Sequence, residues 1–124
     1  MENNITLSTL PKTWILDVDG TILVHNGYKR GGDKLIEGIE EFLAQIRKED
    51  LVILITARKK EQKEQLESFL KENQIRFDQI IYDAPTGERI LVNDDKPSGL
   101  KTAIAINTPR DTCPTTKIER DKTL

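Results

Sequence analysis

Five consecutive apolar residues, Leu51 to Ile55, are the feature that most constrains the fold of this chain. A strand that is apolar on both sides is typical of the centre of a parallel sheet covered on both faces. Strands that alternate with helices indicate layers of helix packed on a mostly parallel sheet. The run therefore predicts an α/β structure, provided that the neighbouring segments supply the other strands and the helices.

The neighbouring segments do show that alternation. Residues 14–18 form a short apolar run that predicts a strand, and Asn26-Gly27 beyond it predicts the tip of a hairpin. Apolar residues at helical spacing predict helices over about 34–48 and 59–73. Further strands are predicted at 77–82, at 89–93 and, more briefly, at 102–106.

Length and charge limit the classes of function that this chain can have. The 124 residues suit one domain over 1–110, followed by a polar and flexible tail over 111–124. A net charge of −2 gives no basic field for nucleic acid, and no apolar run is long enough to span a membrane. With the single Cys113 and no signal-peptide pattern at the N-terminus, we expect a soluble cytoplasmic protein.

Two carboxylates follow the first predicted strand. Asp17 and Asp19 are two residues apart, so their side chains point to the same side of an extended chain. Two negative charges at this spacing favour a bound divalent cation, and oxygen ligands suit Mg²⁺. The alternative is a solvated turn, because Asp-Gly is also a common turn sequence.

Other polar residues end later strands. Thr56, Ala57 and Arg58 follow the central strand, and Asp94 and Asp95 follow the strand predicted at 89–93. In parallel sheets, ligands bind beyond the carboxyl ends of the strands. The architecture therefore predicts that these residues meet Asp17 and Asp19 at one edge.

Together these motifs resemble the haloacid dehalogenase superfamily of aspartate-nucleophile phosphatases. The first family motif, D-x-D-G-T, matches residues 17–21, the second matches Thr56, and the acidic fourth matches Asp94-Asp95. The predicted hairpin matches the family's flap. The resemblance implies a Rossmann-like three-layer sandwich, without a cap domain because no cap fits between Thr21 and Thr56.

The resemblance also implies a mechanism. Asp17 would attack phosphorus, and Asp19 would act as general acid and then as general base. Asp17, the carbonyl of Asp19, and Asp94 would bind Mg²⁺, with Asp95 as an alternative ligand. Thr56, with Ala57 and Arg58 beside it, would bind the phosphoryl group, as would the amides of the turn after Asp17. Arg58 could equally cap its own loop.

The third family motif is a Lys, and the chain departs from the family there, because Ala84 stands near the corresponding place. Lys96 is the favoured substitute, and Lys59 and Lys60 are alternatives. Each of these lysines could equally be a surface charge.

A capless site is open, so it suits a bulky substrate, or one covered by a partner subunit in a homo-oligomer. The segment from Arg89 to Asn107 resembles small family members of polysaccharide and sugar-phosphate metabolism, which implies a phosphorylated small molecule or sugar as substrate. Two alternatives stay open. The missing Lys favours a weak or inactive binding or regulatory domain of the same fold. A receiver-like phosphoacceptor domain also groups aspartates, a Thr and a Lys.

Overall fold

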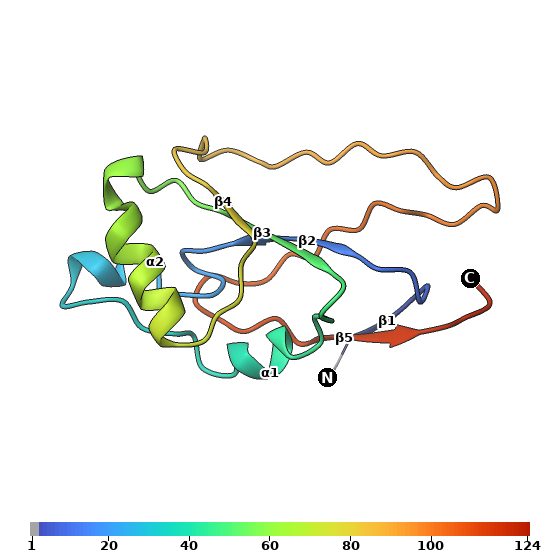
Figure 1. The fold of residues 1–124 in the computed structure, drawn as a ribbon, viewed down its shortest axis with the longest axis horizontal. Coiled ribbons are helices and arrows are strands. Elements are labelled where there is room, and N and C mark those ends of the chain that lie inside the picture. The colour runs from blue at the N-terminus through green and yellow to red at the C-terminus, as the bar shows by residue number, and fades with distance from the viewer. Residues whose placement is uncertain (1–2) are drawn as a thin grey trace.

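A computed structural model describes residues 3–124 as an α/β structure with two separate parallel sheets (Figure 1). The larger sheet has the order β2-β3-β4 and contains β2 (Thr13–Asp17), β3 (Leu51–Ile55) and β4 (Gln79–Ile81). Asp17 is in register with Ile55, and Ile55 with Ile81. The predicted α/β class and parallel sheet are confirmed, and the three strands end at a common edge.

One face of this sheet carries the core. Helix α2 (Lys63–Glu72), which follows the short 3-10 helix η2 (Lys60–Gln62), buries Leu66 and Leu70 in the same cluster as Val52 and Leu54 of β3. Leu51 lies on the opposite face and is 41% exposed. The expectation that β3 is covered on both faces is therefore wrong, because the helices that pack on it share one side.

Helix α1 (Ile39–Leu43) is much shorter than the helix predicted over 34–48. Gly38 precedes it with a φ of 86°, a left-handed conformation that glycine adopts without steric cost. Leu35 and Ile36 lie before this break: Leu35 forms an antiparallel bridge with Leu23, and the Ile36 amide donates to the Ile22 carbonyl at 2.9 Å. Their apolar spacing matches a helix, but they belong to a loop that folds back on residues 22–24.

We call residues 22–36 the flap. Its two arms are held by the Ile36 bond and by the Val24 amide, which donates to the Lys34 carbonyl at 2.9 Å. Asn26 is left-handed, with a φ of 57°, and leads into the 3-10 helix η1 (Gly27–Lys29). The predicted hairpin is thus present as a wide loop rather than a tight turn at Asn26-Gly27.

Residues 84–107 form a long excursion that leaves the larger sheet (Figure 1). It turns between Lys96 and Leu100, where the Lys96 amide donates to the Leu100 carbonyl at 3.0 Å. No strand forms at 89–93 or 102–106, so both predictions are wrong, and Ile90 and Val92 are 87% and 88% exposed. Their apolar pattern is typical of a strand, but residues 89–93 and 102–106 pair with no neighbouring strand in the described structure.

The smaller sheet was not expected from the sequence. It pairs β1 (Asn3–Leu7) with β5 (Thr116–Arg120), so part of the polar segment predicted as a loose tail is a strand. Gln45 ties β5 to the end of α1, since its side chain accepts from the Ile118 amide at 2.7 Å and donates to the Thr116 carbonyl at 3.1 Å. Pairing with β1, which is distant in sequence, makes this segment a strand, although its local hydrophobic periodicity did not predict one.

No helix within residues 3–124 has the length and apolar character needed to cross a bilayer.

Asp50 fastens the start of β2 to the start of β3. Its buried carboxylate accepts from the Lys12 amide at 2.9 Å and from the Trp14 indole and the Arg47 amide, both at 3.0 Å. Burial alone raises the pKa of Asp50, but the backbone donors of Arg47 and Lys12 and the Trp14 indole outweigh it and lower the pKa.

This lowered pKa predicts an acid-sensitive contribution to stability. The contribution is complete above the unfolded pKa and is lost as pH falls below about 4. Asp50→Asn should lower the free energy of unfolding at neutral pH by about 1–3 kcal/mol, because its amide group cannot accept from all three donors. Urea unfolding across pH tests this: the difference between the two proteins should shrink in acid, and a constant difference would contradict the assignment.

Candidate functional site

Asp17 is the last residue of β2 and faces solvent at the carboxyl edge of the sheet. Its Oδ2 accepts from the Thr21 hydroxyl at 3.0 Å, and its Oδ1 accepts from the Arg89 guanidinium at 2.8 Å. The side chain is 36% exposed, so one carboxylate oxygen is accessible to a small ligand once Arg89 shifts. The geometry holds a partly exposed, oriented carboxylate beside a cation.

Asp19 lies in the turn after β2 and connects the first motif to the second. Its Oδ2 accepts from the Thr56 hydroxyl at 3.0 Å, and its Oδ1 accepts from Nη2 of Arg58 at 2.7 Å. Thr56 directly follows β3 and is 1% exposed. The structure thus brings Thr56 and Arg58 to the first motif, as parallel strands with a common edge predict.

Arg58 has a buried side chain, 1% exposed, between two carboxylates. Besides Asp19, it donates to Asp33 of the flap from Nη2 at 2.7 Å and from Nη1 at 3.1 Å. Burial lowers the pKa of Arg58, but the hydrogen bonds to Asp33 and Asp19 outweigh burial and raise it, so the guanidinium stays cationic. Ala57, between Thr56 and Arg58, is exposed.

The structure does not bring Asp94 to this edge. Asp94, Asp95 and Lys96 are exposed in the excursion, and Asp95 pairs with Lys101 at 2.8 Å. Residues 3–124 contain no group of three or more His, Cys, Asp or Glu side chains that could hold a metal ion. The predicted set of Asp17, Asp19 and Asp94 is therefore not assembled here, because the segment that carries Asp94 does not join β2.

Two of the lysines proposed for the third motif contact another carboxylate in place of Asp17. Lys59 pairs with Asp83 at 3.6 Å, and the Lys60 amide donates to the same carboxylate at 3.3 Å. The cation found on Asp17 is Arg89, at the beginning of the excursion. Sequence reasoning missed Arg89 because it stands at the start of a predicted strand and not at the end of one.

The turn after Asp17 is tightened by its own hydrogen bonds. The amides of Thr21, Ile22 and Leu23 all donate to the Val18 carbonyl, and the Gly20 amide donates to the Leu23 carbonyl at 2.7 Å. These amides are therefore engaged, contrary to the expectation that they cradle a phosphoryl group. Asp111 also contacts this turn, since its amide donates to the Gly20 carbonyl at 2.8 Å.

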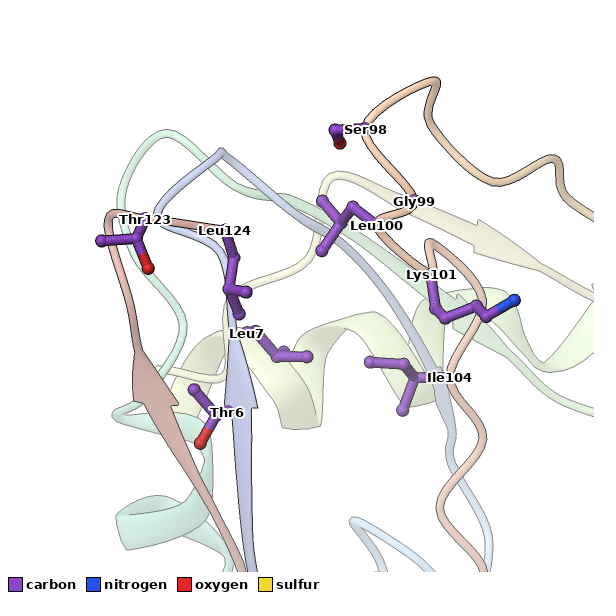
Figure 2. Close-up of a pocket in the computed structure, with 9 residues that line it drawn as sticks. All are labelled: Thr6, Leu7, Ser98, Gly99, Leu100, Lys101, Ile104, Thr123 and Leu124. Atoms are coloured by element: carbon purple, nitrogen blue, oxygen red, sulfur yellow. The ribbon is translucent and has the colours of Figure 1, made fainter.

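A cavity of about 420 Å³ lies elsewhere, between the turn of the excursion and the ends of the smaller sheet (Figure 2). Leu7, Leu100, Ile104 and Leu124 are among its lining residues, and neither motif contributes to it. Because Ser98–Lys101 border this cavity beside Leu7, the turn that carries Lys96 lies next to the smaller sheet.

No protein-family model matches this chain, and no characterised protein or solved structure matches it significantly.

Proposed function

We propose that this chain is a capless phosphomonoester hydrolase of the haloacid dehalogenase type. The observation that carries the proposal is the 3.0 Å contact between Thr56 and Asp19, which follow two different strands, β3 and β2. It joins D-x-D-G-T to the threonine that the resemblance pairs with it. A solvated turn would not require a buried threonine from the next strand.

In the proposed reaction, an oxygen of Asp17 attacks phosphorus and the bond from phosphorus to the ester oxygen breaks. Arg58 and Thr56 hold Asp19 as a carboxylate, so Asp19 first takes up a proton from water and then gives it to the leaving oxygen. Water then attacks the aspartyl phosphate, Asp19 takes the water's proton, and the bond between Asp17 and phosphorus breaks to release inorganic phosphate. Arg89 faces the nucleophile, so it would stabilise the phosphoryl oxygens by charge.

Mg²⁺ is the cofactor that the resemblance implies, but the residues as arranged do not fit it. Asp17 is paired with Arg89, Asp19 is paired with Arg58, and Asp94 supplies no third carboxylate. Mg²⁺ needs a near-octahedral set of oxygens. The proposed reaction therefore runs on the residues alone, and comparing phosphate release in Mg²⁺ and in EDTA tests whether the ion is required.

The test is a screen of phosphorylated metabolites, sugar phosphates included, with the purified chain in Mg²⁺ and in EDTA. Release of inorganic phosphate from at least one monoester supports the proposal. Binding without release would instead favour a non-catalytic phosphoryl-binding domain, which the pairing of both carboxylates with arginine makes the second candidate.

Arg89 should matter more than Lys96 for substrate binding. Arg89→Gln is expected to raise KM for a phosphomonoester by about tenfold, because the variant cannot make one charged hydrogen bond to phosphate. Lys96→Gln, in the exposed turn of the excursion, is the matched control and should leave KM unchanged. Steady-state kinetics checks both, and an unchanged KM for Arg89→Gln would remove Arg89 from the site.

A further inference from the structure

Arg58 links two parts of the molecule that are far apart in sequence. On one side it binds Asp19, two residues after the proposed nucleophile in the sequence, and on the other side it binds Asp33, in the return arm of the flap. The side chain of Asp33 is 2% exposed and that of Arg58 is 1% exposed. The flap is therefore fastened to the sheet edge by a buried carboxylate–guanidinium–carboxylate bridge.

The geometry of the bridge is specific to arginine. Nη2 donates to both carboxylates, at 2.7 Å each, while Nη1 reaches only Asp33 and Nε reaches only Asp19. A planar guanidinium can hold two carboxylates in fixed orientation, whereas an ammonium group acts as a point charge. The orientation of Asp19 thus depends on where Asp33 holds Arg58.

A second flap residue contacts the same guanidinium. The ring of Tyr28, in η1, lies 4.1 Å from Cζ of Arg58, a distance suited to a cation–π contact. Tyr28 and Asp33 both lie in the part of the flap that follows Asn26. The flap therefore contacts Arg58 through two residues, and movement of the flap is expected to disturb the contact between Arg58 and Asp19.

We propose that Arg58 and Asp33 are positioning residues, which lock the flap over the sheet edge and orient Asp19 for proton transfer. The catalytic part rests on the proposed function, whereas the locking part does not. Within this bridge, Asp33 bonds to Arg58 and not to Asp17 or Asp19. Any effect of Asp33 on turnover would therefore pass through Arg58.

The test replaces Asp33 by Asn, which keeps the shape and removes the charge. Glu37→Gln is the matched control, because it removes an exposed carboxylate just beyond the flap's return arm. Hydrogen exchange of the Val24 and Ile36 amides, which close the flap, should accelerate by about tenfold in Asp33→Asn and stay unchanged in the control. kcat should fall by about 10- to 100-fold with little change in KM.

Unchanged exchange in Asp33→Asn would overturn the lock, and faster exchange with unchanged kcat would overturn the positioning role. If Asp33→Asn does not fold, Tyr28→Leu loosens the flap while sparing both ion pairs, and the same two readouts apply. A wild-type chain that releases no phosphate would defeat the proposed function and the positioning role, while amide exchange would still decide the lock.

Discussion

Asp17→Asn is expected to abolish phosphate release while the protein stays folded. The amide cannot form an aspartyl phosphate, so turnover should fall by roughly a thousandfold or more. The substitution chiefly removes the exposed ion pair with Arg89, and exposed ion pairs contribute only about 0–1 kcal/mol to stability. Steady-state phosphate release and urea unfolding measure the two effects separately.

The control for this variant is Glu64→Gln, which makes the same carboxylate-to-amide change on the exposed surface of α2. Its turnover should equal that of the wild type. Near-normal turnover in Asp17→Asn would show that another residue carries the reaction.

Arg58→Met should lower the free energy of unfolding more than Asp50→Asn or Asp17→Asn. The change leaves the buried Asp33 carboxylate and the nearly buried Asp19 carboxylate next to each other without their cation. Breaking a buried ion pair by removing one partner costs about 3–5 kcal/mol, which is a large fraction of the stability of a small domain. Urea unfolding at neutral pH gives the magnitude.

The double variant Arg58→Met with Asp33→Asn provides the control. Removing the charge of Asp33 should recover part of the stability that Arg58→Met takes away, because less uncompensated charge stays buried. A loss below about 1 kcal/mol in Arg58→Met, or no recovery in the double variant, would contradict the account of a buried bridge.

Local patterns in the sequence were sufficient to predict two elements that pack on the core. The apolar run Leu51–Ile55 is a strand, and the stripe that contains Leu66 and Leu70 is a helix over Lys63–Glu72. The helix predicted over 34–48 failed because Gly38 interrupts it, and a glycine inside a helical pattern is a signal that lowers such a prediction.

Pairing between distant segments was not predictable in the same way. Ile5 and Leu7 alternate with polar residues, but the pattern does not reveal that β5 is their partner. The apolar run at 90–92 looks like a strand, yet a strand also needs a neighbour that donates and accepts hydrogen bonds. Without that pairing, Asp94 does not reach Asp17.

The candidate site likewise contains residues that the sequence predicted and residues that it did not. The contact between Asp19 and Thr56 was predictable, because β2 ends at Asp17 and β3 ends just before Thr56, at one edge of the sheet. Asp33 and Arg89 were missed because they come from the flap and the excursion, where no periodicity fixes the direction of a side chain.

The most direct test of the central claim is to look for the phosphoryl group on Asp17. The wild-type chain is mixed with a substrate identified in the screen, or with a small phosphodonor, quenched in acid within the first turnover, and mapped by peptide mass spectrometry. We expect phosphate on Asp17, removed again at the rate of turnover. Phosphate release with no labelled Asp17, or a stable label on Asp17 without release, would contradict hydrolysis through this residue.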